Sequence, residues 1–315
     1  MGAAQRFSIG AYGVPTRYRE VVLTVSNMIS AVVTAYERVE QTLATLRVLQ
    51  SCVPAPDEIL VHVDANQTAC ESAIRNAFPG IQILRSDEQI GPGGGRNRLV
   101  SAARGEFIAS FDDDSYPIDS DYFARASHVF EKFPEASLVC AALYHVGESI
   151  GLDERSAHWT ADFSGGACIF RRQAFLDAGG YVPLPVAYGM EEVDLAIRLH
   201  SQGGRILTTS WLRVFHNTDL KRHGDPKVTA GSIANLALLA YLRYPVSLWG
   251  IGVGQCANRL LWLLRHGRHR GILKGVTMIP AHLRANRGYR LPVSKQVVRS
   301  YLALRRAPLS TDYTD

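Results

Sequence analysis

The stretch EFIASFDDDSYP, residues 106–117, runs from an apolar segment directly into three consecutive aspartates, Asp112, Asp113 and Asp114. The apolar segment predicts a buried strand that ends at Phe111. Side chains two residues apart in an extended chain point to the same side, so Asp112 and Asp114 can face one point while Asp113 turns aside. A divalent cation that prefers oxygen ligands, Mg²⁺ or Mn²⁺, would remove the repulsion between them. The position after a buried strand therefore favours a metal–diphosphate site over a solvated acidic turn.

Strand and helix patterns alternate on both sides of this stretch. Strands are predicted at residues 29–34, 58–63, 81–86, 106–111 and 136–143, with two short late strands at 205–210 and 212–216. The segment GPGGGRNRLVSAARG, residues 91–105, predicts a glycine-rich loop followed by a helix. The alternation predicts an α/β fold with a mostly parallel central sheet flanked by helices. Ligands of such sheets bind beyond the carboxyl ends of the strands, and the polar segments 34–37, 64–66 and 112–114 fall there.

The net charge of +5 conceals two regions of opposite sign. No Asp or Glu occurs between Pro226 and Thr311, where there are 14 Lys or Arg residues, whereas the preceding residues carry 20 basic and 27 acidic side chains. We therefore divide the chain into a catalytic domain, residues 1–225 with its core at 29–217, and a basic, apolar, helical C-terminal region, residues 226–315. Five scattered cysteines without a CxxC pair, and a start without a signal-peptide pattern, favour a cytoplasmic protein.

The C-terminal region has no uninterrupted apolar run of about 18 residues, so a spanning helix is not expected. Trp249 and Trp262, close to Arg265 and Arg268, are typical of helices that lie on an anionic membrane surface. This places the protein peripherally on the cytoplasmic face of a membrane. Packing on the catalytic core and formation of a homodimer stay open. Nucleic acid is not an expected partner, because the body of the chain is acidic and no nucleic-acid-binding motif occurs.

Five segments, in order, resemble the family 2 glycosyltransferases of GT-A fold. They are VVTAYER at 32–38, EILVHVDAN at 58–66, the segment 91–115 that ends in the aspartates, GGACIFRRQAFLDAGGY at 165–181 and MEEVDLAIRL at 190–199. The resemblance covers about residues 29–217. It implies a metal-dependent, inverting transfer of a sugar from a nucleoside-diphosphate sugar to an acceptor hydroxyl, as in a polysaccharide or lipid-linked glycan. Mg²⁺ or Mn²⁺ would be the cofactor.

The resemblance also implies residue roles. Glu192 is the expected catalytic base, with Glu191 as the close alternative; from the motif alone, acidic residues that favour a helix N-terminus explain both equally well. His216 would join Asp112 and Asp114 as a metal ligand, although a structural histidine is as compatible with the sequence. Gly165, Gly166 and Asp194 would lie on the acceptor and donor-sugar side, Asp194 by bracing the motif. The donor nucleotide would be bound by Thr34, Ala35, Tyr36, Glu37, Asp64, Arg96, Asp112 and Asp113, with Arg96 on the diphosphate or on a carboxylate of the site.

Two other functions remain as alternatives. A sugar nucleotidyltransferase needs the same metal and diphosphate chemistry, but it would carry a glycine-rich loop with Arg or Lys directly after the first strand, where this chain has VVTAYER. A membrane-associated scaffold with a degenerate site is disfavoured because all three acidic positions keep their carboxylates.

Overall fold

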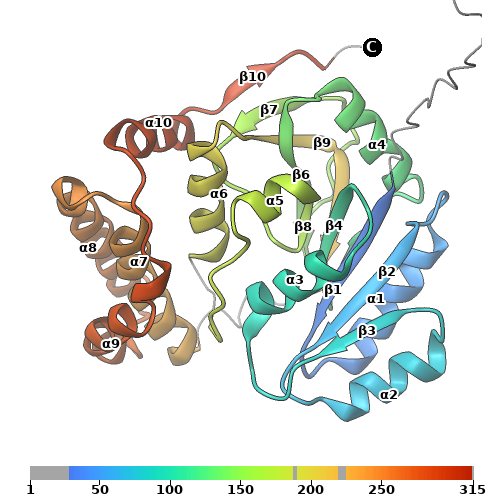
Figure 1. The fold of residues 1–315 in the computed structure, drawn as a ribbon, viewed down its shortest axis with the longest axis horizontal. Coiled ribbons are helices and arrows are strands. Elements are labelled where there is room, and N and C mark those ends of the chain that lie inside the picture. Colours follow the sequence, from blue (N-terminus) through green and yellow to red (C-terminus); the bar gives the residue numbers. More distant parts are fainter. Residues whose placement is uncertain (1–27, 187–189, 219–224, 314–315) are drawn as a thin grey trace, which may run out of the picture.

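The computed structural model describes residues 28–186, 190–218 and 225–313. A single ten-stranded sheet runs through the molecule, with helices on both faces and a layer of further helices outside one of them (Figure 1). The strand order is β10-β7-β9-β6-β8-β4-β1-β2-β3, and β5 pairs with β9 off this path. The strands are β1 Ile29–Ala35, β2 Glu58–Val63, β3 Gln82–Arg85, β4 Phe107–Asp112, β5 Ser115–Pro117, β6 Ala136–His145, β7 Ala157–Thr160, β8 Ala167–Arg171, β9 Arg205–His216 and β10 Leu309–Thr311.

The helices divide between two apolar cores, one on each face of the sheet. Helices α1, α2 and α4 pack against the face that carries Val33 and Phe111. Helices α3, α5, α6, α7 and α10 pack against the face that carries Val32 and Ile108. The helices are α1 Val39–Ser51, α2 Thr68–Ala77, α3 Gly91–Ala102, α4 Tyr122–Lys132, α5 Arg172–Asp177, α6 Glu191–Ser201, α7 Pro226–Arg243, α8 Trp249–Arg265, α9 Ile272–Ala285 and α10 Lys295–Arg306, with single 3-10 turns at Val246–Leu248 and Arg287–Tyr289.

The predicted α/β fold is confirmed, and the parallel half of its sheet positions the site. Strands β1, β2, β3 and β4 are all parallel, and Thr34 at the end of β1 lies beside Asp112 at the end of β4. The other half is mixed, because β8 runs antiparallel to both β4 and β6. The carboxyl ends of β1, β2 and β4 therefore lie along one edge, where the polar segments of the sequence gather.

Three predicted elements differ from the structure. The expected glycine-rich loop is the first part of helix α3, which begins at Gly91. The two short late strands are one strand, β9, with an irregularity in its pairing to β6. The short strands β5, β7, β8 and β10 were not predicted; each has three to five residues, which is too short for an alternating pattern to stand out.

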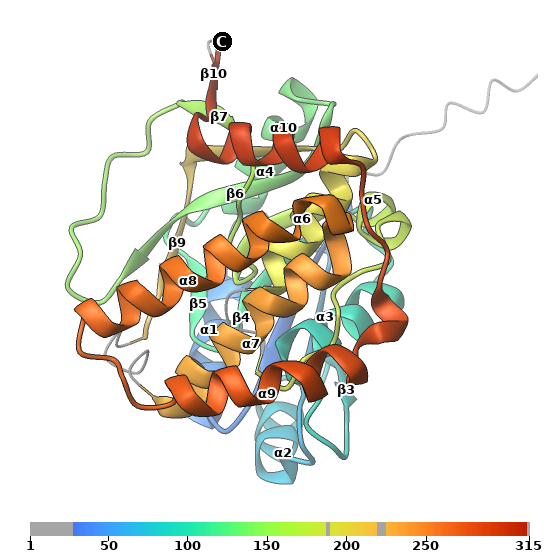
Figure 2. The same cartoon turned by 90° about the vertical axis from the view of Figure 1, so that its left-hand side faces the viewer.

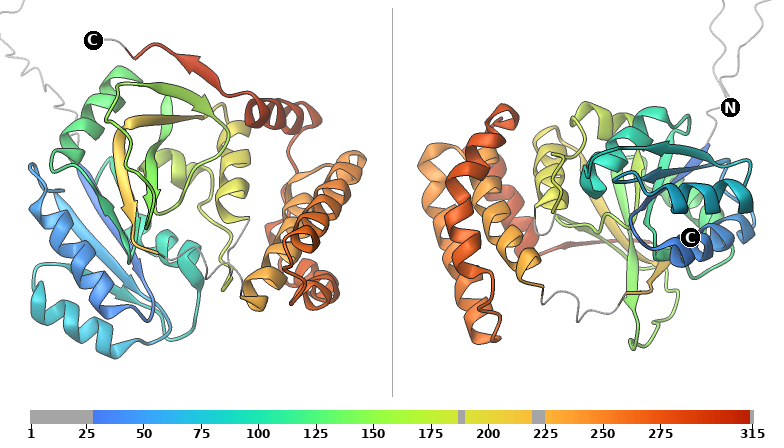
Figure 3. Two further views of the ribbon diagram at one scale, coloured as in Figure 1. Left: turned by 180° about the vertical axis from the view of Figure 1, so that it is seen from behind. Right: turned by 90° about the horizontal axis from the view of Figure 1, so that it is seen from below.

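The C-terminal region forms an outer layer of helices and then returns to the sheet. Helix α7 packs on the core, and α8 and α9 lie outside it (Figures 2 and 3). Strand β10 then pairs antiparallel with β7 at the edge of the sheet. Within the described ranges, no helix combines the length and the apolar character needed to cross a bilayer.

Candidate active site

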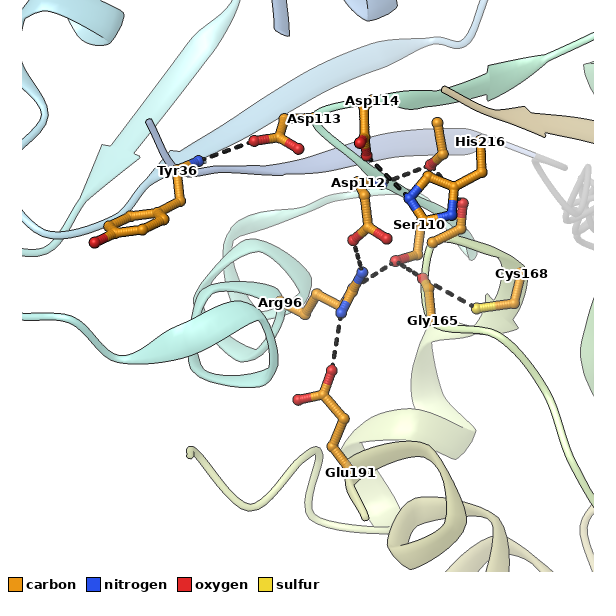
Figure 4. Close-up of polar contacts among 12 residues, drawn as sticks. Tyr36, Arg96, Ser110, Asp112, Asp113, Asp114, Gly165, Cys168, Glu191 and His216 are labelled. Atoms are coloured by element: carbon orange, nitrogen blue, oxygen red, sulfur yellow. Dashed lines mark hydrogen bonds and ion pairs between the residues drawn. The ribbon is translucent and has the colours of Figure 1, made fainter. Parts of the chain in front are cut away.

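The three aspartates after β4 turn to three different sets of partners (Figure 4). Asp112 forms an ion pair with Arg96. Asp113 accepts a hydrogen bond from the backbone N–H of Tyr36, with 3.2 Å between the heavy atoms, and forms an ion pair with Arg38. Asp114 contacts Arg38 as well. Guanidinium groups therefore balance the charge of all three carboxylates.

Burial affects these carboxyl groups differently. Asp113 is 2% exposed, and burial raises its pKa to about 7 although the Arg38 guanidinium opposes this. Burial also opposes ionisation of Asp114, but the contacts with His216 and Arg38 outweigh it and hold the pKa of Asp114 below its usual value. Asp114 therefore stays charged more readily than the adjacent Asp113.

His216, at the end of β9, lies against Asp114. Its Nε2 is 3.1 Å from Oδ1 of Asp114, and this buried oxygen has no other hydrogen-bond donor among the described residues. Burial disfavours protonation of His216, yet Asp114 and Asp112 together raise its pKa. In the described part of the chain, no three His, Cys, Asp or Glu side chains are already clustered as metal ligands, so the set Asp112, Asp114 and His216 stays a prediction.

Arg96 connects the strand end to the helix that carries the glutamates. It is 2% exposed and donates from Nε to Ser110 at 3.0 Å, from Nη1 to Glu191 at 3.1 Å and from Nη2 to Asp112. Burial would lower its pKa, but the charges of Asp112 and Glu191 raise it instead. Of the two contacts predicted for Arg96, the structure has the one with carboxylates of the site.

Glycines make this close arrangement possible. A Cβ atom at Gly93 would lie 2.5 Å from Oε2 of Glu191, and one at Gly166 would collide with the carboxylate of Asp112. Gly91 has φ of +72°, which L side chains rarely adopt, and a side chain there would meet the carbonyl of Leu184. The glycines at the start of α3 therefore serve close packing between helix and site, and this is why GPGGG folds as a helix here.

The two glutamates at the start of α6 occupy different environments. Glu191 is 2% exposed, and burial and the adjacent Glu192 raise its pKa to about 8 against the opposing charge of Arg96. Glu192 is half-buried, and burial raises its pKa too. Its Oε1 lies beside Gly165, 3.2 Å from where a Cβ atom of that residue would stand. Of the two glutamates, only Glu192 combines partial exposure with a raised pKa.

Asp194 does not reach the acceptor side. It is completely buried and forms ion pairs with Arg198 at 2.6 Å and with Arg243 at 2.5 Å. Arg243 belongs to α7 and also donates to the carbonyl of Tyr289 at 2.8 Å. The placement of Asp194 beside the substrates is thus corrected, because its oxygens are bound by two guanidinium groups. Its position agrees with the expected bracing of the motif.

The predicted nucleotide-binding residues are only partly free to meet a ligand. Asp64 accepts hydrogen bonds from Ser86 at 2.7 Å and from the N–H groups of Ile90 and Gly91 at 3.0 and 2.9 Å, so it fixes the start of α3. Ala35 is buried in the core and Thr34 is half-buried. The turn that follows holds Tyr36 next to Asp113, and Glu37 is exposed with φ of +62°.

Sequence reasoning missed three residues that shape the site. Arg38 contacts both Asp113 and Asp114. The hydroxyl of Ser110 donates to the carbonyl of Gly165 at 2.6 Å, and that of Ser115 to the carbonyl of Gly166 at 2.7 Å. A signal for Arg38 was available, because it is the sole basic residue between positions 29 and 46 and follows a strand end that faces three carboxylates. The serines gave no comparable signal.

Comparison with known families agrees with this geometry. Residues 30–180 match the model of glycosyl transferase family 2. This segment is a family 2 glycosyltransferase domain. No curated protein sequence matches this glycosyltransferase.

Two solved structures resemble the glycosyltransferase in fold. The first is GalNAc-T7 with UDP, GalNAc and Mn²⁺, with a TM-score of 0.55 and 13% identity over 70% of this chain and 48% of that chain. The second is the mannosyltransferase PcManGT from Pyrobaculum calidifontis in complex with GDP-Man and Mn²⁺, with a TM-score of 0.54 and 15% identity over 88% of this chain and 84% of that chain. The chain thus spans about half the length of GalNAc-T7. These likenesses place the domain in the GT-A fold.

Proposed function

We propose that this glycosyltransferase moves a sugar, with inversion, from a nucleoside-diphosphate sugar to a hydroxyl of a polysaccharide or lipid-linked glycan, and that it requires Mg²⁺ or Mn²⁺. One observation carries the proposal. Arg96 is bound at the same time to Asp112, at the end of β4, and to Glu191, at the start of α6. The residues proposed for the diphosphate and those proposed for the acceptor therefore belong to one connected site.

The side chains around Asp114 fit a divalent cation. Asp112, Asp114 and His216 supply two carboxylates and an imidazole, which are acceptable ligands for Mn²⁺, and the carboxylates suit Mg²⁺ equally. The imidazole of His216 is the polar group that lies against the buried Oδ1 of Asp114, and an oxygen and an imidazole placed in this way can bind one metal ion. When bound, the cation would neutralise charge on the leaving diphosphate. The structures of GalNAc-T7 and PcManGT with Mn²⁺ and nucleotides support this choice of cofactor.

Glu192 is the proposed general base. A base must reach the acceptor hydroxyl and work best with a pKa near the operating pH. Burial raises the pKa of Glu192, and the residue is partly exposed beside Gly165. Glu191 is nearly inaccessible to solvent, and its carboxylate forms an ion pair with Arg96. We therefore assign proton removal to Glu192 and positioning of Arg96 to Glu191.

The turn after β1 is the proposed contact for the donor nucleotide. Tyr36 and Glu37 form its tip, and Arg38 holds it against Asp113 and Asp114. A cationic guanidinium beside the aspartates would stabilise the phosphates of a donor that enters there. Asp64 contributes to the donor site indirectly, because its carboxylate accepts hydrogen bonds from the backbone at the start of α3 and so fixes that helix.

The experiment is a thermal-shift screen of UDP-, GDP- and dTDP-sugars with and without Mn²⁺. A ligand at 100 times its dissociation constant stabilises the native state by about 2.7 kcal/mol. We expect one base to stabilise the wild type only when metal is present, and Asp114→Ala to lose both this shift and turnover. Asp177→Asn, an exposed residue at the end of α5, is the matched control.

Three results would contradict the proposal. Full metal-dependent donor binding and turnover by Asp114→Ala would remove Asp114 from the site. Release of pyrophosphate from a nucleoside triphosphate and a sugar phosphate would instead identify a sugar nucleotidyltransferase. A wild-type protein that binds no nucleotide in the presence of Mn²⁺ would point to a non-catalytic scaffold.

A further inference from the structure

The outer helices α8 and α9 expose apolar side chains to an unusual degree. Residues 246–291 contain 11 of the 17 large hydrophobic side chains that are exposed in the described structure. Leu273 is 77% exposed, Val253 70% and Leu264 56%. Soluble monomeric proteins rarely expose so many neighbouring apolar side chains unless a partner covers them.

These helices also contact the rest of the protein over a narrow strip. In α8 only Gly252 and Leu263 are buried, and in α9 only Gly275. Helix α7, by contrast, is buried along most of its length and separates the outer pair from the core (Figure 2). The broad sides of α8 and α9 therefore face outward.

The charge of this layer selects the kind of partner. No acidic residue occurs between Pro226 and Thr311, and 14 basic residues do. Arg265, Lys274 and Arg284 are exposed on the two outer helices. Two copies joined through this face would bring like charges together, which is unfavourable in a self-complementary interface. A partner surface that is anionic and also accepts apolar side chains would match both the basic charge and the exposed apolar side chains of α8 and α9.

We propose that α8 and α9 bind the surface of a bilayer that contains anionic lipid. Trp249 and Trp262 are 38% and 39% exposed, the partial exposure expected of rings that lie at the headgroup level. Val253, Leu264 and Leu273 enter the boundary of the acyl chains, and the basic side chains meet the headgroup phosphates. This binding is independent of the proposed donor and base, since none of these residues belongs to the active site.

The test measures co-sedimentation of the full-length protein with vesicles of phosphatidylcholine alone or mixed with phosphatidylglycerol. We expect binding to the mixed vesicles that weakens with salt. Lys274→Gln with Arg284→Gln should weaken it about 30-fold, taking about 1 kcal/mol for each basic side chain. Arg47→Gln with Lys132→Gln, two exposed residues of the catalytic domain, removes the same charge elsewhere and should have little effect.

A second variant tests the apolar contribution. The triple change of Val253, Leu264 and Leu273 to Ser should weaken vesicle binding at least about tenfold. The control changes Val53, Val146 and Leu152 to Ser, which are 74%, 57% and 75% exposed in the catalytic domain. Unchanged metal-dependent donor binding in both variants would show that folding and the active site are intact.

Several results would overturn the proposal. One is no preference of the wild type for mixed vesicles at low salt, and another is equal binding by the test and control variants. A dimer in light scattering that the triple variant dissociates would assign the face to a second copy. Binding of a DNA duplex that falls in Lys274→Gln with Arg284→Gln but not in the triple variant would identify a general polyanion site.

Discussion

The active-site edge and the outer helical layer use charge in opposite ways. At the site, Arg96 is 2% exposed and bound to two carboxylates. In the outer layer, Lys274 and Arg284 are exposed in a segment that lacks acidic residues. Buried, paired charges fix geometry and shift pKa values, whereas exposed cations of one sign attract an external anion. These properties agree with the chemistry proposed for the first region and with the binding of an anionic surface proposed for the second.

A buried ion-pair network joins the two regions. Asp194 follows Glu192 by two residues on α6, and Arg243 of α7 binds both Asp194 and the carbonyl of Tyr289. Arg198 completes the network from α6 itself. The helix that presents the proposed base is therefore fixed to the helix that supports the outer layer. Changes at the site, at this junction and on the outer layer should therefore differ in the size of their effects.

Replacing Arg96 with Met should have the largest effect. It leaves Asp112 and Glu191 without their buried cation, and the loss of one partner of a buried pair costs about 3–5 kcal/mol. Chemical denaturation at pH 7 measures this loss. Arg104→Met, at a side chain that is 75% exposed and paired with Glu58, should cost no more than about 1 kcal/mol. Equal losses would remove the distinction between buried and exposed charge.

The pH dependence of the same variant has a defined sign. Burial already raises the pKa of Glu191 to about 8, and loss of Arg96 can only raise it further. A carboxyl group with a raised pKa in the folded state binds its proton more tightly there than in the unfolded chain, so lower pH favours folding. The deficit of Arg96→Met should therefore grow as the pH rises from 7 through 8 to about 9, where only the wild type releases the Glu191 proton, and stay nearly constant between pH 7 and pH 5. The same denaturation experiment measures it.

Glu192→Gln should lower kcat by about 10²–10⁴-fold, the usual contribution of a general base. Donor affinity, measured by metal-dependent thermal shift, should stay near that of wild type. Glu191→Gln is the matched comparison and should affect stability more than turnover, because it weakens the pair with Arg96. A larger fall in kcat for a folded Glu191→Gln than for Glu192→Gln would reassign the base.

The sequence predicted the fold well, whereas the roles of its candidate site residues stay predictions. Apolar periodicity located β1, β2 and β4, because each strand is long and its ends are polar. It could not show that the glycines of α3 are helical. Gly93 and Gly91 are needed because Glu191 and Leu184, which are distant in the chain, leave no room for a side chain there. Periodicity likewise could not show that the carboxylate of Asp64 is hydrogen-bonded to backbone N–H groups. Such partners are set by tertiary packing, which local pattern does not encode.

Arg243→Lys tests the junction with a smaller change. It keeps the charge but loses the forked geometry that binds Asp194, so a loss of about 1.5–3 kcal/mol is expected, the value of one hydrogen bond to a charged group. Equilibrium denaturation measures it, with Arg299→Lys, an exposed residue of α10, as the control. Identical stabilities would mean that the network does not fix α6 to α7.

The smallest effect on the free energy of unfolding is expected for an exposed side chain of α8. Two adjacent leucines of this helix, one exposed and one buried, allow the comparison. Leu264 is 56% exposed and Leu263 is completely buried. Leu264→Ala should change the free energy of unfolding in water by less than about 0.5 kcal/mol, because the side chain already contacts solvent in the folded protein. Leu263→Ala should cost about 2–5 kcal/mol through the cavity that it leaves. If Leu264→Ala proved as costly as its neighbour, the outer face would be packed against protein, and its apolar side chains would have no role in binding a bilayer.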